Sequence, residues 1–346
     1  INSINMSEKK TTLREISSKD IKKFNDTLSD DGHCDIKEYK ERFLKYFDVH
    51  LKEYYEDFKE YFSDSDSNSS SSEESDSDID RKSYLKNNLN KIVTGNCLDE
   101  MKNFQDEVAD IIICDPPYNI GKDFGNNKTY KDISVYLEWC DKWISECFRI
   151  LKPNGTLYIY GFSETLAFIR TVVKYNVKWL VWHYTNKTVP SKKFWQISHE
   201  SILCCYKEKP IFNTDDVREP YTKTFLKNSA GKTRKATKGR FSDGTKETKY
   251  KAHNRGALPR DVIKISSLAG GAGKKERVNH PTQKPLKLCE KLLKASLNKN
   301  IDNNLLVVPF AGSGSECVAA KQLGINFIGF EINKNYVTIC EKRLRE

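Results

Sequence analysis

The stretch Ala109-Asp-Ile-Ile-Ile-Cys-Asp-Pro-Pro-Tyr118 joins a short apolar run to a stiff turn. An apolar run of this length, bounded by a turn signal, is typical of a buried strand in a parallel sheet. The two prolines fix their φ angles and remove two N–H groups, so a rigid turn should follow the strand directly. We therefore expect Asp115 and Tyr118 to be presented at the carboxyl end of a buried strand.

Strand and helix patterns alternate on both sides of this stretch. Residues 136–151 carry apolar side chains at helical spacing, and Lys152-Pro-Asn-Gly155 should end that helix. Further strands are expected near 155–160, 178–184, 200–206, 305–309 and 325–330, and further helices near 163–175, 285–297, 314–323 and 333–344. This alternation predicts an α/β fold in which helices cover both faces of the sheet.

A second strand end carries a glycine turn. Leu305 to Ser315 predicts a strand, a turn with two glycines and a helix start, and glycine lets the backbone approach a ligand closely. The next strand ends at Glu331, where an acid can accept hydrogen bonds from ribose hydroxyls. The third glycine of a dinucleotide motif is missing, because position 317 is Cys, and the chain has no Walker-type phosphate loop. A nucleoside cofactor without phosphates, such as S-adenosylmethionine, is compatible with both observations.

The tetrapeptide Asp115-Pro-Pro-Tyr118 suits an aromatic exocyclic amine. Such an amine is a weak nucleophile, because its lone pair is delocalised into the ring. The Asp115 carboxylate and the Pro116 carbonyl could accept its two hydrogens and so favour attack on a methyl sulfonium. Tyr118 could stack on the base. The alternative is a structural proline turn, but the glycine turn in the same chain favours catalysis, because ligands of doubly wound sheets bind where strands end.

Composition narrows the class of protein. The 346 residues include 38% hydrophobic and 11% aromatic residues, enough for one large folded domain or two modest ones. No apolar run reaches the roughly 18 residues that span a bilayer, and no secretory leader is recognisable, so we expect no membrane association. The ten cysteines form no C-x-x-C pair and the six histidines are scattered, which predicts reduced thiols, no metal site and a cytoplasmic protein.

Charge divides the chain into two parts. Residues 1–80 hold 12 Lys and Arg against 21 Asp and Glu, whereas the remaining 266 residues hold 46 against 27. A body this basic usually binds a polyanion. Within it, residues 207–279 carry more than twice as many basic as acidic side chains and little periodicity. A long irregular segment of this kind favours a functional insert over a structural loop.

The N-terminal region carries two different patterns. Residues 37–62 predict an amphipathic helix, which packs on the main body or, as the alternative, binds a partner. Residues 63–80 contain nine serines and seven acidic residues without Lys or Arg, which predicts a solvated linker. The alternative is that this tract mimics a nucleic-acid backbone and competes for the basic body. We therefore separate an extension (1–62) and a linker (63–80) from the rest of the chain.

The motifs resemble those of the S-adenosylmethionine-dependent DNA amino-methyltransferases. Asp115-Pro-Pro-Tyr-Asn-Ile-Gly121 is similar to their catalytic motif, Phe310-Ala-Gly-Ser-Gly-Ser315 to their cofactor motif, and His280-Pro-Thr-Gln-Lys-Pro285 to the segment just before it. His199-Glu-Ser-Ile202 resembles another family segment, and Gly95-Asn-Cys-Leu98 departs at Asn96 from the family's Gly-Asp. The catalytic motif precedes the cofactor motif with the basic insert between them, which is the order of the β class.

The resemblance covers about residues 90–346 and implies a Rossmann-like, seven-stranded sheet, circularly permuted so that residues 305–309 form its first strand. It implies a catalytic half (86–206), a target-recognition insert (207–279) and a cofactor-binding half (280–346). Asp115, Pro116, Pro117 and Tyr118 would hold the target base. The cofactor would be lined by Phe310, Gly312, Ser313 and Gly314, with Glu331 on its ribose, Thr282, Lys284 and Asp115 at its methionine end, and Asn96 and Cys97 near its adenine. His280 is expected to be a packed loop histidine.

The aspartate that heads the tetrapeptide resembles the adenine-N6 members, whereas cytosine-N4 members more often carry serine there. The resemblance implies a DNA-associated enzyme that flips an adenine out of double-stranded DNA and methylates its N6, with insert lysines and arginines on phosphates. Cytosine N4 is the alternative target. An RNA methyltransferase and a catalytically silent nucleic-acid-binding regulator are less favoured. Family members often form homodimers and often pair with a cognate restriction endonuclease, so both are candidate partners.

Overall fold

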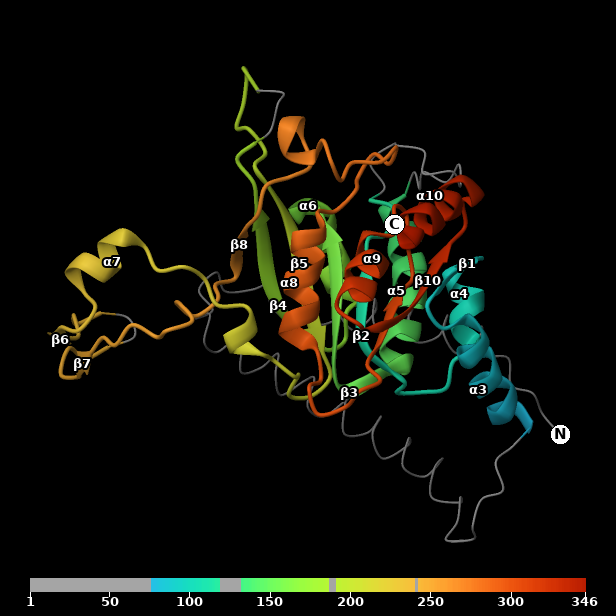
Figure 1. The fold of residues 1–346 in the computed structure, drawn as a ribbon, viewed down its shortest axis with the longest axis horizontal. Coiled ribbons are helices and arrows are strands. Elements are labelled where there is room, and N and C mark those ends of the chain that lie inside the picture. Colours follow the sequence, from blue (N-terminus) through green and yellow to red (C-terminus); the bar gives the residue numbers. More distant parts are fainter. Residues whose placement is uncertain (1–75, 119–131, 187–190, 240–241) are drawn as a thin grey trace, which may run out of the picture. The chain divides into compact units, whose positions relative to one another are not determined.

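Eight strands form the central sheet, in the order β1-β10-β9-β2-β3-β5-β4-β8 (Figure 1). The computed structural model describes residues 76–118, 132–186, 191–239 and 242–346. The strands are β1 (Lys91–Thr94), β2 (Ala109–Cys114), β3 (Leu151–Gly161), β4 (Asn176–His183), β5 (His199–Tyr206), β8 (Val262–Lys264), β9 (Leu305–Val308) and β10 (Asn326–Glu331). Neighbours from β1 to β3 are parallel, β5 is antiparallel to β3 and β4, and β8 is parallel to β4.

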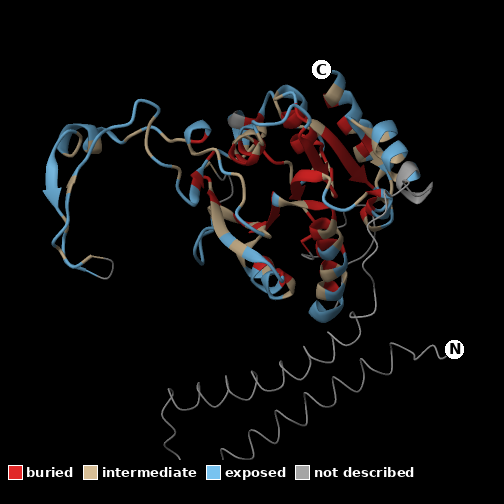
Figure 2. Cartoon of the chain, turned by 90° about the horizontal axis from the view of Figure 1, so that it is seen from below, coloured by how far each residue is buried: buried red, intermediate tan, exposed pale blue. Residues whose placement is uncertain are grey.

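Helices cover both faces of this sheet, as predicted. Alternate residues of β2 point to opposite faces, so Ile111 and Ile113 join one core and Ile112 and Cys114 the other. The first core contains α8 (Leu286–Ser296), α9 (Ser315–Gln322) and α10 (Lys334–Arg345), and the second contains α5 (Ile133–Ile150) and α6 (Ser163–Val172). Figure 2 shows the buried residues concentrated in the strands and on the inner sides of these helices. None of the helices in the described ranges is long and apolar enough to cross a membrane.

The position of β9 decides where the motifs meet. β9 lies between β10 and β2, and Leu306 pairs with Ile111 in parallel register. Because parallel neighbours end at the same edge of a sheet, the turn after β2 and the glycine turn after β9 emerge side by side. The C-terminal β9–α9–β10 unit therefore supplies central strands next to β2, as the permuted order requires.

The structure corrects three expectations. The sheet has eight strands rather than seven, because β8, which belongs to the basic insert, adds to the free edge of β4. β1 was not among the expected strands. It has four residues, of which only Ile92 is buried, and so short a segment shows no clear alternation of apolar and polar side chains. Residues 76–80, expected in the linker, begin α3 (Asp76–Asn88), whose Tyr84 and Leu85 pack against the core. The predicted helix over 37–62 lies outside the described residues.

The basic insert projects from the body over part of its length. It contains the short helix α7 (Lys223–Asn228) and the hairpin of β6 (Thr233–Lys235) and β7 (Glu247–Lys249). From residue 218 to residue 262, no described side chain is buried, and Figure 2 shows this segment extending from the body as an exposed strip. Its base is fixed by Glu219, which accepts from Lys291 of α8 and from Arg260.

Candidate active site

A cavity of about 450 Å³ opens where β2, β9 and β10 end. Its volume falls in the range of small-molecule sites. Among the residues that line it are twelve of the thirteen predicted site residues: Asn96, Cys97, Asp115, Pro116, Pro117, Tyr118, Thr282, Lys284, Phe310, Gly312, Ser313 and Glu331. The structure thus brings together segments that lie more than 200 residues apart in the sequence.

Gly314 is the predicted residue that does not line the cavity. Its φ angle is +73°, and a Cβ there would lie 2.9 Å from the Cys340 Sγ of α10. Glycine is required at this position for the left-handed turn and for close packing of α9 on α10. Gly312 differs, because it lines the cavity with a φ of +51°, and a Cβ there would lie 2.9 Å from the His280 Nε2.

One end of the cavity is organised by Glu331, at the carboxyl end of β10. Its Oε2 accepts from the Gly312 N–H at 2.8 Å and its Oε1 accepts from the Asn333 N–H at 2.8 Å. Burial raises the pKa of Glu331, whereas the backbone N–H groups lower it. These bonds fix the carboxylate and leave lone pairs on both oxygens for two hydroxyl donors.

Flat and apolar side chains form the walls beside this acid. Leu98, Phe310 and Ile332 line the cavity, and the ring of Trp139 from α5 lies 5.7 Å from that of Phe310. Trp139 belongs to residues 136–151, whose apolar spacing predicted only a helix, and neither Ile332 nor Leu98 was predicted to have a role in the site. Walls of this kind, next to a carboxylate at a strand end, fit the purine and ribose of an adenosine moiety.

The adjoining segment near residue 96 is shaped by a helix cap. The Asn96 side-chain oxygen accepts from the Leu98 N–H at 3.2 Å and so begins α4 (Cys97–Glu100). Cys97 is buried, and burial raises the pKa of its thiol. The neutral Cys97 thiol and the capping amide of Asn96 therefore form part of the cavity wall and contribute no charge to it.

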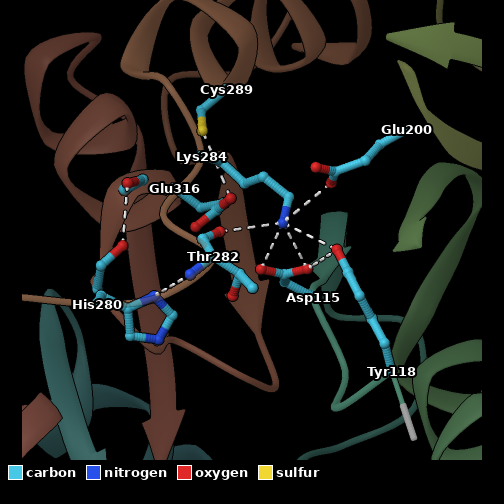
Figure 3. A network of polar contacts seen from close by, with 10 residues as sticks. Asp115, Tyr118, Glu200, His280, Thr282, Lys284, Cys289 and Glu316 are labelled. Carbon is cyan, nitrogen blue, oxygen red and sulfur yellow. Dashed lines mark hydrogen bonds and ion pairs between the residues drawn. The ribbon is translucent and has the colours of Figure 1, made fainter. Parts of the chain in front are cut away.

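At the other end, a charged network surrounds Lys284 (Figure 3). Its Nζ donates to both Asp115 oxygens at 2.8 Å, to the Tyr118 hydroxyl at 2.9 Å and to the Thr282 carbonyl at 3.2 Å. Burial by itself lowers the pKa of Lys284, but Asp115 and Glu200 outweigh it and raise the pKa to about 12. Lys284 is only 2% exposed, so its charge is balanced inside the protein. In this structure the ammonium holds Asp115, a contact that no sequence motif predicted.

Glu200 of β5 is a second acid in this network. Its Oε2 lies 3.6 Å from the Lys284 Nζ, and no described residue donates a hydrogen bond to that oxygen. Burial raises the pKa of Glu200, while Lys284 opposes the rise. The motif His199-Glu-Ser-Ile202 was the signal for this residue, but the sequence alone gave it no role.

Glu316 is a third acid, at the start of α9, and it also lines the cavity. The Cys289 thiol donates to its Oε1 at 3.4 Å. Burial, and next the charge of Asp115, raise the pKa of Glu316 to about 7. No sequence signal marked this residue, because an acid in the first turn of a helix is ordinarily a solvated partner of the helix dipole.

The proline turn is anchored from two sides. The Tyr136 hydroxyl of α5 donates to the Pro117 carbonyl at 2.9 Å, and the Tyr118 hydroxyl donates to the Asp115 Oδ1. Burial raises the pKa of Tyr118, so its phenol is a neutral donor. Tyr118 is 3% exposed and its ring packs edge-on against Phe162, so stacking of Tyr118 on a base stays a prediction.

His280 is packed, as expected. Its ring lies 4.6 Å from that of Tyr336, and its Nδ1 accepts from the Thr282 N–H at 3.4 Å. Burial lowers the pKa of His280 to about 4. The imidazole is therefore neutral near pH 7 and positions the glycine turn and Thr282.

Comparison with known proteins identifies the family. Residues 109–342 match the DNA methylase family, N6_N4_Mtase. The chain belongs to this family. It is similar to the Type II methyltransferase M.HpaI of Haemophilus parainfluenzae, with 30% identity over 263 residues that cover 73% of this chain and 74% of that protein. It is also similar to the DNA adenine methyltransferase YhdJ of Escherichia coli (strain K12), with 31% identity over 264 residues that cover 75% and 83%.

The fold agrees with this assignment. The solved structure of the PvuII DNA methyltransferase (cytosine-N4-specific) superposes with a TM-score of 0.50 and 17% identity, over 73% of this chain and 85% of that chain. The chain is an S-adenosylmethionine-dependent DNA amino-methyltransferase. The fixed acid at Glu331, the apolar walls and the carboxylates of Asp115 and Glu316 fit the ribose, the adenine and the cationic end of this cofactor.

Proposed function

We propose that this chain transfers a methyl group from S-adenosylmethionine to the N6 of adenine in double-stranded DNA. The observation that carries the proposal is that Asp115-Pro-Pro-Tyr118 and the Gly312–Glu331 pair line one cavity. A methyl donor and an acceptor amine bound at these two places would share a crevice. In-line transfer requires this proximity.

The cofactor, when bound, supplies an electrophilic methyl group on a sulfonium. Lys284 occupies one lone pair on each Asp115 oxygen, and Tyr118 occupies a second on Oδ1. The Asp115 Oδ2 therefore retains a lone pair that can accept an amine hydrogen. An amine held in this way would direct its nitrogen lone pair toward that methyl group, and the proton displaced by methylation would pass to the Asp115 carboxylate and then to solvent. The buried ammonium keeps Asp115 in place, so little reorganisation is needed during transfer.

Two observations favour adenine over cytosine. An aspartate heads the tetrapeptide, and a relative at 31% identity is named a DNA adenine methyltransferase. The similarity to a cytosine-N4-specific enzyme is at 17% identity and concerns the fold alone. Cytosine N4 remains the second candidate, because the same acceptors would suit its amino group.

The projecting segment supports binding to duplex DNA. Its exposed lysines and arginines, on α7 and around the β6–β7 hairpin, can neutralise phosphates. The target amine is paired inside a duplex, so the enzyme must extrude the base to reach Asp115. We assign target recognition to the insert over 207–279, and keep the homodimer and the cognate endonuclease as predictions of the resemblance.

The proposal is tested by transfer of a labelled methyl group to unmethylated genomic DNA, followed by digestion and chromatography of the nucleosides. We expect N6-methyldeoxyadenosine, and no label with the Asp115→Ala variant. Label in N4-methyldeoxycytidine would select the second candidate. Label only in RNA, or none with any nucleic acid, would refute the proposal. Sequencing of the modified bases would then give the target sequence.

A further inference from the structure

Two adjacent aromatic side chains are exposed to an unusual degree. Phe194 is 80% exposed and Trp195 is 87% exposed, and no other large hydrophobic side chain in the described ranges exceeds 63%. They lie within residues 191–197, all of which are exposed, and Lys192 and Lys193 directly precede them. Aromatic faces next to cations are a common combination in surfaces that bind nucleic acid.

The position of this segment relates it to the active site. It belongs to the connection between β4 and β5, which rises beyond the strand ends in Figure 1. The pairing of Ser201 with Gly161 places the start of β5 beside the end of β3, at the edge where β2 presents Asp115. Glu200, five residues after Trp195, reaches the Lys284 network. The two aromatic residues are therefore carried at the catalytic edge of the sheet.

The base of this connection is held firmly. The Tyr184 N–H donates to the Ser198 carbonyl at 2.9 Å. The Asn186 side chain donates to the Ser267 carbonyl at 2.7 Å and accepts from the Ser267 N–H at 2.9 Å. Hydrogen bonds therefore anchor both ends of the connection. The exposure of Phe194 and Trp195 is not explained by loose ends of this segment. Phe194 and Trp195 nevertheless present most of their apolar surface to solvent.

We propose that Phe194 and Trp195 stack on DNA bases beside the extruded nucleotide, with Lys192 and Lys193 on the flanking phosphates. This inference rests on the proposed function. Extrusion leaves a gap in the base stack, and an aromatic side chain that fills or wedges such a gap offsets part of the cost of unpairing. The neighbouring positive charges favour DNA over a second copy of this basic protein as the occupant.

The test uses the Phe194→Ala/Trp195→Ala double variant of the full chain. The substrates are duplex oligonucleotides with the sequence found by methylation mapping, whose target base faces either its normal partner or an abasic site. Stacking of one base contributes a factor of roughly five to one hundred. We expect kcat on the paired target to fall by about this factor. On the unpaired target kcat should stay within about twofold of the unmodified protein, because extrusion is then nearly free.

The matched control is Tyr175→Ala, which removes another exposed aromatic side chain (41%). Tyr175 directly precedes β4, at the edge of the sheet opposite the connection between β4 and β5, so this substitution should leave both rates unchanged. An unchanged rate in the double variant, or an equal loss on both duplexes, would overturn the inference. So would light scattering that shows a dimer only with Phe194 and Trp195 present. Absence of transfer by the unmodified protein would instead refute the proposed function.

Discussion

The Lys284 Nζ lies 2.8 Å from both carboxylate oxygens of Asp115, although 169 positions separate the two residues in the sequence. Lys284 comes just before α8 and Asp115 just after β2, so the pair joins the two halves of the permuted fold. A buried ion pair of this kind is costly to break, because one partner is then left charged without compensation. The pair fixes the carboxylate that we propose as the acceptor for the target amine, so stability and activity should depend on the same contact.

Replacement of Lys284 by Met should therefore lower stability and abolish transfer. We expect a loss of about 3–5 kcal/mol in the free energy of unfolding, measured with urea at about pH 8. Adding Glu200→Gln should recover about 1–3 kcal/mol, because one uncompensated acid is removed. The control Lys294→Met removes a partly exposed lysine that pairs with Glu290 and should change stability by less than about 1 kcal/mol. Additive effects in the double variant would contradict the coupling.

Asp115→Ala should separate chemistry from binding. The variant removes an acceptor for the amine, so the rate of methyl transfer should fall by about a hundredfold or more. Binding of duplex DNA, measured by fluorescence anisotropy, should change little, because we assign the phosphate contacts to the insert over 207–279 and not to Asp115. Asp99→Ala, which removes an exposed acid in a surface pair with Lys102, should leave the rate unchanged. Turnover retained in the Asp115 variant would refute the assigned role.

Glu331→Ala should weaken binding of the cofactor more than binding of DNA. The variant should lose two hydrogen bonds from the ribose hydroxyls to the carboxylate. We therefore expect the cofactor Kd, measured by calorimetry, to rise by roughly 10- to 100-fold. The Gly312 and Asn333 N–H groups also lose their acceptor, so part of the effect comes from the glycine turn. Glu341→Ala, on the exposed side of α10, is the control. An unchanged cofactor affinity would remove Glu331 from the site.

Much of this arrangement follows from local sequence patterns. The apolar run of β2, the glycine turn and the acid at the end of β10 each have a local signal, and parallel pairing then brings their ends together. Glu200, Glu316 and Trp139 could not be assigned in this way, because their roles arise from burial next to residues that are distant in the sequence. β8 was missed for a similar reason, since three residues gain strand geometry only by pairing with β4.

Glu316→Gln should change how stability depends on pH. The pKa of Glu316 is raised to about 7 in the folded protein, from 4.5 for the ordinary side chain. The folded state thus binds this proton more tightly than the unfolded chain, and the stability it contributes is present below about pH 4.5 and is lost as the pH rises through 7. A neutral glutamine avoids this loss. The variant should therefore gain on the unmodified protein by about 3 kcal/mol between about pH 5 and pH 8.

This gain is measured by urea unfolding of both proteins across the same pH range. Glu341→Gln, an exposed acid, is the control and should leave the slope unchanged. If the free energy of unfolding depends on pH in the same way in the Glu316 variant and in the unmodified protein, burial does not raise the pKa of Glu316, and the prediction is wrong.

Gly314 and Gly324 allow the cost of a backbone angle to be separated from the cost of a clash. Both have φ near +70°, but a Cβ at Gly324 meets no atom within 4 Å, whereas one at Gly314 meets the Cys340 Sγ at 2.9 Å. Gly324→Ala should therefore lower the free energy of unfolding by about 1 kcal/mol, the cost of the angle alone. Gly314→Ala should cost about 1–3 kcal/mol more, because α9 and α10 must move apart.

The Gly314→Ala/Cys340→Ala double variant should recover part of that additional loss, because the sulfur is gone while the angle is unchanged. Thermal unfolding of the three variants measures the difference. The cofactor Kd of Gly314→Ala should rise less than that of Gly312→Ala, since Gly312 lines the cavity and Gly314 does not. Equal stability losses at 314 and 324, with no recovery in the double variant, would show that contact with α10 does not require a glycine at 314.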